Sequence, residues 1–239
     1  MRHYGKKMKR TQHQRTEGLT ISFWAGLYDR CTALIGFGKS FRTETIRLAN
    51  IYSRPIKCLD IGCGTGVLAI EAAKRLPSGS SIIGIDPELA MLAVARRNLA
   101  RVNGLHSSLM FRDGLIEKIP FPDGYFDLVL CTMTTHHLSR KLKYKGFKEI
   151  YRVLKPGGSF LNVDFGIASI LHVITFISAI KLFAFLYLNF IETMSTNFMM
   201  TIPDHYTSMI PLLLAKTGFL QVHYLESSFK QVVFLKARK

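Results

Sequence analysis

The segment Asp60-Ile61-Gly62-Cys63-Gly64-Thr65-Gly66 constrains the fold of this chain more than any other feature. It follows a short apolar run, Ile56 to Ile61, and it precedes Val67 to Leu76, whose composition is that of a helix. Glycines between a strand and a helix let the backbone turn tightly and let a ligand approach the main chain closely. The pattern therefore predicts a strand, a ligand-binding loop and a helix.

The alternation of strands and helices continues along the chain. After the first strand, we expect strands at Ser81 to Ile85, Ser108 to Arg112, Asp127 to Thr132 and Ser159 to Asp164. The last of these follows an expected turn, Lys155-Pro156-Gly157-Gly158, and helical faces are expected at Leu89, Leu92, Ala95 and Leu99 and at Phe147, Ile150, Tyr151 and Leu154. Such alternation predicts a doubly wound α/β fold, a parallel sheet with helices on both faces.

The length of 239 residues suits one α/β domain with a tail. Residues 1–18 are polar and basic, and are expected to form a flexible arm, whereas residues 19–239 are expected to form a single domain. Its first part (19–50) is expected to be an N-terminal cap of two short helices broken around Gly36 and Gly38, and its second (51–165) a ligand-binding core. An apolar helical insertion or lid (166–200) is expected next. The last part (201–239) is expected to hold a helix at Ser208 to Ala215 and an antiparallel strand pair, Phe219 to Leu225 and Val232 to Leu235.

The acid before the glycines indicates the charge of the ligand. Dinucleotide-binding loops have the spacing G-x-G-x-x-G and lack an acid equivalent to Asp60, which would repel a pyrophosphate but attract a cationic ligand. Asp60 thus favours S-adenosylmethionine over NAD. Asp86 lies 20 residues beyond Gly66 at the end of the second strand, where a carboxylate can accept both ribose hydroxyls; the alternative is a helix cap before Pro87.

Two further positions have both a ligand-binding and a structural interpretation. Asp113 with Gly114 ends the third strand, where a short acid could receive the adenine amino group, but Asp-Gly also forms turns. Met91 could flank the adenine, although an apolar residue on this helix also suits the core.

Four motifs carry a resemblance to a known family. They are Cys58-Leu59-Asp60-Ile61-Gly62-Cys63-Gly64-Thr65-Gly66, Gly84-Ile85-Asp86-Pro87, Ile119-Pro120-Phe121-Pro122-Asp123-Gly124-Tyr125-Phe126-Asp127 and Arg152-Val153-Leu154-Lys155-Pro156-Gly157-Gly158. From Ile21 to about Asp164 the chain resembles the class I S-adenosylmethionine-dependent methyltransferases, and within them the ubiquinone and menaquinone biosynthesis C-methyltransferases of the methyltransferase type 11 group. Three further segments are similar to that group: Tyr28-Asp29 before Gly36-Phe37-Gly38, Ile202-Pro203-Asp204, and Thr217-Gly218-Phe219. The segment after the fourth strand, Thr134-Thr135-His136-His137-Leu138, is more similar to small-molecule methyltransferases in general.

The resemblance implies a fold and a donor site. The fold is Rossmann-like, with a mostly parallel seven-stranded sheet that contains one antiparallel strand. Asp60 and the glycines would contact the methionine part of the donor, Asp86 the ribose and Asp113 the adenine edge, while Tyr28 would lie over the donor. The expected donor-binding residues are Asp60, Gly62, Cys63, Gly64, Thr65, Gly66, Asp86, Pro87, Met91, Asp113, Gly114 and Thr132.

The expected chemistry is an in-line methyl transfer, in which the enzyme mainly holds donor and nucleophile in contact. A phenol, activated carbon or ammonium nucleophile must also lose a proton, for which histidine is the natural acceptor at neutral pH. His136 and His137 follow the fourth strand and, with Tyr28, are the candidate catalytic residues. The histidines could instead begin a helix or pack against the sheet, and Tyr28 could be a core aromatic.

The apolar segment Phe165 to Ile191 predicts a small, lipophilic acceptor beneath a lid. It is interrupted by His172 and Lys181, which argues against a bilayer crossing, but it could lie at a membrane interface. The net charge of +16, from 32 basic and 16 acidic residues, would attract an anionic membrane or nucleic acid. One alternative is a nucleic-acid methyltransferase, but the fourth strand lacks the Asn/Asp-Pro-Pro-aromatic pattern of amino-directed base methylation, which makes a nucleic-acid partner the less favoured interpretation. The other alternative is a non-catalytic donor-binding protein.

The four cysteines predict neither a disulfide framework nor a metal site. We therefore expect no metal and a cytoplasmic location, with peripheral contact to the membrane. Neither the oligomeric state nor the methylated atom follows from the sequence.

Overall fold

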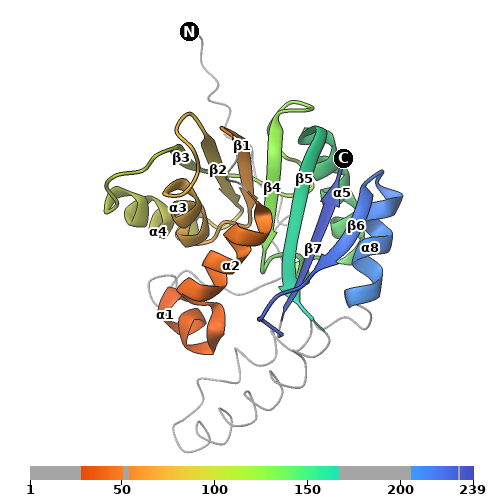
Figure 1. Cartoon of the computed structure of the whole chain (residues 1–239), viewed down its shortest axis with the longest axis horizontal. Helices are drawn as coiled ribbons and strands as arrows, with labels where there is room; N and C mark the ends of the chain where they lie inside the picture. Colours follow the sequence, from red (N-terminus) through yellow and green to blue (C-terminus); the bar gives the residue numbers. More distant parts are fainter. Residues whose placement is uncertain (1–27, 51–53, 167–205, 231) are drawn as a thin grey trace, which may run out of the picture.

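The fold is built on a seven-stranded sheet with the order β3-β2-β1-β4-β5-β7-β6 (Figure 1). The computed structural model describes residues 28–50, 54–166, 206–230 and 232–239. Neighbouring strands from β1 to β5 are parallel, whereas β7 is antiparallel to both β5 and β6, which confirms the expected sheet with one antiparallel strand. The strands are β1 (Lys57–Ile61), β2 (Ser81–Asp86), β3 (Ser108–Asp113), β4 (Phe126–Thr132), β5 (Leu154–Phe165), β6 (Leu220–Leu225) and β7 (Val232–Arg238).

Helices cover both faces of the sheet because successive strand residues point to opposite sides. In β1, Cys58 packs into the core cluster that contains residues of α2 (Lys39–Ala49), α3 (Val67–Ala73) and α4 (Leu89–Ala100). Its neighbour Leu59 packs into the opposite cluster, with residues of α5 (Arg140–Val153) and α8 (Tyr206–Lys216). Burial on both faces explains why the central strands β2 and β4 are nearly continuous apolar runs.

The N-terminal helices lie at the end of the sheet where β4 and β5 finish (Figure 1). Helix α1 (Tyr28–Thr32) continues into a π-helical turn, Ala33–Phe37, and α2 follows Gly38. A break around these glycines was expected from the sequence. Since ligands of parallel sheets bind at the carboxyl ends of the strands, this cap borders the expected ligand site.

The start of β5 corrects the sequence prediction. Leu154, expected on a helical face, pairs with Phe126, and the ladder resumes only at Ser159, which pairs with Leu128. The expected turn 155–158 is therefore an irregularity within β5 opposite one residue, Asp127. The Asp127 carboxylate explains this arrangement, because it accepts a 2.7 Å hydrogen bond from Lys155 and so holds the extra residues at the sheet. Helix α3 likewise ends at Ala73, three residues earlier than the expected Leu76.

Several expected segments lie outside the described residues. They are the basic arm (1–18), the first part of the N-terminal cap (19–27), the apolar insertion or lid beyond Gly166 up to residue 200, and the motif Ile202-Pro203-Asp204. Within the ranges that the structure describes, no helix combines the length and the apolar composition needed to cross a membrane.

The guanidinium of Arg152 at the end of α5 holds the loop before β4. It donates hydrogen bonds to the carbonyls of Phe121 (2.8 Å) and Ile119 (2.9 Å), and it pairs with the carboxylates of Glu149 and Asp123. Only a planar group with several donors can satisfy all four partners at once. The loop therefore depends on this one side chain.

We expect Arg152→Lys to lower the free energy of unfolding by about 1 to 3 kcal/mol, because lysine leaves carbonyls of the loop without a donor. Urea denaturation measures this change. The control is Arg47→Lys, which alters an ion pair with Glu44 on the exposed face of α2, and whose expected cost is below about 0.5 kcal/mol. Equal costs for the two variants would contradict the role of Arg152.

Candidate functional site

The loop after β1 is fastened to the end of β2. The backbone N–H groups of Gly62 and Cys63 both donate to the carbonyl of Ile85, at 2.8 and 3.1 Å. Because β1 and β2 are parallel neighbours, the loop and the turn after β2 lie side by side at the carboxyl edge of the sheet. This edge brings together the acids that the sequence singled out.

Asp86 is the link between the loop and α4. One carboxylate oxygen accepts a hydrogen bond from the Gly64 N–H (2.9 Å), and the other accepts one from the Glu88 N–H (2.8 Å), beyond the half-buried Pro87. Burial raises the pKa of Asp86, and these two hydrogen bonds oppose the rise. The structural alternative expected for Asp86, a helix cap, is wrong, because α4 begins only at Leu89 and its N-cap residue is Glu88, without a side-chain cap. Each oxygen still has a second lone pair that could accept a ligand hydroxyl.

Asp60 is a buried carboxylate with an unused oxygen. Its side chain is 2% exposed, and its Oδ2 atom has no hydrogen-bond partner in the described part of the chain. Burial, and secondarily the negative charge of Asp86, raise the pKa of Asp60 to about 7. A buried carboxylate without a partner is unfavourable unless a cation neutralises it. The position therefore suits a positively charged ligand group.

Two glycines of the loop explain why side chains are excluded from it. A Cβ atom on Gly62 would lie 2.6 Å from Cγ2 of Thr134, which follows β4. Gly64 has a φ of +53°, and a Cβ atom there would meet no atom within 4 Å among the described residues. The main chain at Gly64 therefore borders space that no described residue fills, next to the Asp86 carboxylate that its N–H contacts.

Helices α1 and α4 are each fastened to the same loop by a hydrogen bond to Thr65. The Thr65 hydroxyl donates to the Asp29 carboxylate at 2.5 Å, and the Asn98 side chain donates to the Thr65 carbonyl at 3.0 Å. The neighbouring residue, Tyr28, packs against the buried side chain of Met91 on α4. Burial, followed by the charge of Asp29, raises the pKa of Tyr28. At neutral pH its hydroxyl is therefore protonated and can donate a hydrogen bond.

The remaining expected donor-site residues surround this edge. Asp113 is exposed at the end of β3, where it pairs in register with Asp86, and the Gly114 N–H donates to the Asp86 carbonyl at 3.4 Å. At the end of β4, the hydroxyl of Thr132 is buried and has no partner among the described residues. Cys63 is buried beneath the loop, and burial raises the pKa of its thiol. The structure thus gathers all the expected residues at one edge.

The two histidines form a short turn after β4, Thr135–His137, with ring centroids 3.8 Å apart. The Nδ1 atom of His136 lies 2.8 Å from a carboxylate oxygen of Asp164, at the end of β5. Burial, followed by repulsion from His136, lowers the pKa of His137 to about 4. His137 is therefore neutral at physiological pH.

Sequence reasoning missed three residues that hold the site together: Asp29, Asn98 and Asp164. Asp164 lies near the end of the fifth strand, just as Asp60 and Asp86 lie near the ends of the first and second strands. This shared position at the carboxyl edge could have indicated a site residue. Asp29 belongs to the Tyr28-Asp29 motif quoted above, but nothing in the sequence linked Asp29 or Asn98 to their partner Thr65, which lies 36 and 33 residues away.

The raised pKa of Asp60 predicts a pH-dependent stability. Between its ordinary value of 3.8 and about 7, the folded protein holds a proton that the unfolded chain releases, so the Asp60 contribution to stability falls as pH rises through this range. We expect the free energy of unfolding of Asp60→Asn to exceed that of the wild type by roughly 3 kcal/mol at pH 8, and to differ little from it at pH 4. Chemical denaturation at both pH values measures this.

Asp127→Asn is the matched control with the opposite sign. Burial alone would raise the pKa of Asp127, but hydrogen bonds from the Lys155 side chain and the Lys57 N–H outweigh burial and lower it. Its carboxylate therefore stabilises the fold above its ordinary pKa of 3.8, and the substitution should reduce stability at pH 8. Loss of stability in Asp60→Asn at pH 8 would contradict the account of Asp60.

Comparison with known proteins shows which family this domain resembles. Residues 58–158 match a family described as "Methyltransferase domain". The fold is similar to the crystal structure of a putative S-adenosyl-L-methionine-dependent methyltransferase from Methanococcus maripaludis, with a TM-score of 0.64, 20% identity and coverage of 97% of each chain. Residues 58–158, which are less than half of the chain, are therefore similar to methyltransferase domains, and the fold as a whole is similar to that of such a protein.

Curated relatives narrow the resemblance. The chain is 36% identical over 140 residues to demethylmenaquinone methyltransferase of Thermus thermophilus, covering 58% of this chain and 60% of that protein. It is 31% identical over 143 residues to the ubiquinone/menaquinone biosynthesis C-methyltransferase UbiE of Pectobacterium carotovorum, covering 59% and 55%. The matched region thus spans little more than half the length of these relatives. They confirm the expected resemblance to the quinone biosynthesis methyltransferases.

Proposed function

We propose that this protein transfers the methyl group of S-adenosylmethionine to a small, lipophilic acceptor. The observation that carries the proposal is the buried Asp60 carboxylate, whose Oδ2 atom has no partner among the described residues and lies at the glycine loop. The donor has an ammonium and a sulfonium group, so it supplies the positive charge that this oxygen lacks.

The other residues at this edge suit the remaining parts of the donor. The carboxylate oxygens of Asp86 can accept the ribose hydroxyls while keeping their hydrogen bonds to the backbone. Asp113 can accept from the adenine amino group, and Met91 and Tyr28 line the side of the site formed by α1 and α4. The open space at Gly64 admits the methionine part of the donor.

Bound S-adenosylmethionine supplies an electrophilic methyl carbon, so the protein mainly aligns the acceptor with it. When the acceptor nucleophile carries a proton, a nearby base must take that proton. His136 and His137 are the candidate bases, since both follow β4 at this edge. Tyr28, whose hydroxyl is protonated at neutral pH, can instead donate a hydrogen bond to the acceptor.

The surroundings of His136 support a lipophilic acceptor. The ring of Phe165 lies 4.9 Å from that of His136, and the ring of Phe37 on the N-terminal cap lies 6.0 Å from Phe165. Aromatic side chains at this position favour an apolar ring or chain in contact with them. The quinone biosynthesis enzymes among the relatives agree with an acceptor of this kind.

Gly64→Ala tests donor binding directly. A Cβ atom at Gly64 would project into space that no described residue fills, which we assign to the donor. We expect the substitution to weaken S-adenosylmethionine binding at least 10-fold, about 1.4 kcal/mol, in calorimetric titration.

Gly124→Ala is the control, because Gly124 also has a positive φ (+61°) and open space around it, but lies in the turn before β4. Both variants should lose about 1 kcal/mol of stability from the left-handed backbone, while only Gly64→Ala loses donor affinity. Titration with NAD should give no binding. Wild-type protein that binds NAD in preference to S-adenosylmethionine would overturn the proposed function.

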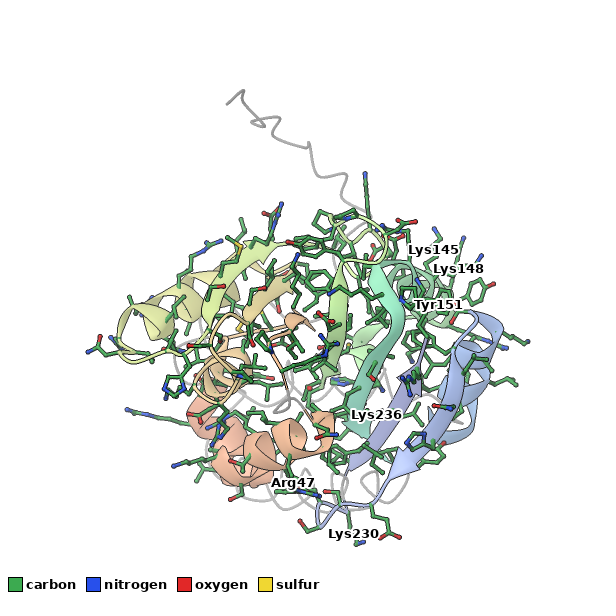
Figure 2. The ribbon with its side chains drawn as sticks, turned by 45° about the horizontal axis from the view of Figure 1, so that its top comes forward. Arg47, Lys145, Lys148, Tyr151, Lys230 and Lys236 are labelled. Carbon is green, nitrogen blue, oxygen red and sulfur yellow. The ribbon has the colours of Figure 1, made fainter. Side chains whose placement is uncertain are left out.

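We also propose that a basic face of α5 contacts an anionic membrane, where a lipophilic acceptor would reside. Lys141, Lys145 and Lys148 are exposed and share one side of the helix, and Figure 2 shows Lys145 and Lys148 close together. None of the ion pairs found in the described ranges includes these three lysines. Their charge is therefore available to lipid phosphates.

We expect the triple variant Lys141→Gln/Lys145→Gln/Lys148→Gln to bind phosphatidylglycerol vesicles at least 10-fold more weakly, at about 1 kcal/mol per lysine. Vesicle co-sedimentation measures the partition coefficient. The control, Arg97→Gln/Arg101→Gln/Lys118→Gln, removes the same charge from exposed positions elsewhere. Equal weakening by both triple variants would show that net charge alone drives binding.

A further inference from the structure

The carboxylate of Asp164 is the most fully hydrogen-bonded acid at the site edge. One of its oxygens accepts from the Thr135 hydroxyl (2.6 Å) and the His136 N–H (3.0 Å). The other lies 2.8 Å from His136 Nδ1 and accepts from the Phe165 N–H (2.9 Å). The side chain is 1% exposed. Burial alone would raise the pKa of Asp164, but His136 and these hydrogen bonds hold it well below its usual range, so the group is ionised.

An ionised carboxylate determines which nitrogen of His136 carries the proton. Since the carboxylate can only accept, Nδ1 must be the donor of the 2.8 Å contact. In the neutral ring, Nε2 then has a free lone pair. The backbone bond from the His136 N–H to the same carboxylate also fixes the turn that carries the ring. The ring is therefore held in one tautomer and in one orientation.

Among the described residues, three other titratable groups lie near this pair: Lys143, His137 and the buried Cys131, whose thiol pKa is raised by burial and then by the charge of Asp164. Lys143 of α5 is buried and interacts with the charge of Asp164, which raises its pKa while burial, the larger effect, lowers it. His137 stacks on His136 but is neutral at physiological pH. Asp164 is thus the negative group available to stabilise a protonated His136, and Lys143 offsets part of its charge.

The position of His136 places it at the proposed donor site. Thr134, two residues before it, packs against Gly62 of the glycine loop. The ring of Phe165 adjoins the imidazole at 4.9 Å, so an apolar ring next to His136 would have an aromatic partner. The side chain of His136 is 13% exposed, which leaves the ring accessible at its edge.

We propose that Nε2 of His136 accepts the proton of the acceptor, and that Asp164 is the positioning residue that keeps this nitrogen unprotonated. The proposal rests on the proposed function and narrows it to acceptors whose nucleophile must lose a proton, such as a phenol or the activated ring carbon of a hydroquinone. As the nucleophile bonds to the methyl carbon, the carbon–sulfur bond breaks with its electron pair on sulfur. The proton of the nucleophile passes to Nε2, and solvent later removes it.

The tautomer can be measured without knowing the acceptor. In the full chain labelled with ¹⁵N-histidine, long-range ¹H–¹⁵N spectra distinguish protonated from unprotonated ring nitrogens, and His136→Gln identifies the signals of His136 among the eight histidines. We expect Nδ1 protonated and Nε2 unprotonated. The reverse pattern in the wild type would overturn the proposal, even if Asp164 variants fail to fold.

Asp164→Asn should remove the preference, so that Nε2 becomes the protonated nitrogen. Asp127→Asn, which alters a carboxylate at the opposite end of β4, should leave the His136 signals unchanged. The rate of His136 modification by diethylpyrocarbonate, which needs an unprotonated nitrogen, should fall at least 10-fold in Asp164→Asn only. A folded Asp164→Asn protein with the wild-type tautomer and the wild-type rate would exclude the role of Asp164.

The acceptor class is tested with 1-naphthol, a phenol on an apolar bicyclic ring, added to the ¹⁵N-labelled protein with S-adenosylhomocysteine. We expect its hydroxyl to shift the Nε2 signal of His136, whereas 1-methoxynaphthalene, which has no such proton, should not. Equal effects of the two compounds, or no effect of either, would overturn the acceptor class. Failure of S-adenosylmethionine to bind the wild type would refute the proposed function and leave the tautomer result standing.

Discussion

The site depends on the carboxylate of Asp86, because its two oxygens join segments that the sheet alone does not connect. They accept the N–H groups of Gly64, in the loop after β1, and of Glu88, before α4. This pairing turns the loop toward the carboxyl edge and brings the negative charge of Asp86 close to Asp60, whose pKa it helps to raise. The ability to hold a cation therefore follows from the same contact that orders the loop.

The sequence predicted the sheet and its edge because these depend on local patterns. Apolar runs bounded by turn residues marked every strand of the sheet, and the spacing of glycines marked the loop between β1 and α3. The order and direction of the strands follow from the right-handed connections of alternating strands and helices. The start of β5 was predicted wrongly because Lys155–Gly158 reads locally as a turn, whereas its pairing depends on Asp127 in another strand.

The contacts that complete the site could not be predicted, because their partners are distant in sequence. Asp29 meets Thr65 across 36 residues, and His136 meets Asp164 across 28. Each is an ordinary polar residue by composition, and only the fold brings it to a specific partner. The sequence therefore identified which residues lie at the edge, but not which of them hold the N-terminal cap and the histidine turn in place.

Asp60 and Asp164 show how one edge can present two acids with opposite properties. Both are buried, yet the pKa of Asp60 is raised by burial and by Asp86, whereas hydrogen bonds and His136 lower that of Asp164 despite its burial. The two side chains also lie on opposite faces of the sheet. Asp164 lies beside Ile210 and Pro211 of α8. Asp60 alternates in β1 with Leu59 and Ile61, which pack on the α8 side, so the Asp60 side chain lies on the other face. A carboxylate without a partner can receive a cationic donor, and a saturated one can orient a base. The two carboxylates lie on opposite faces of the sheet, while the glycine loop and the histidine turn meet at its carboxyl edge, so a cation bound at Asp60 need not compete with His136 for the same carboxylate.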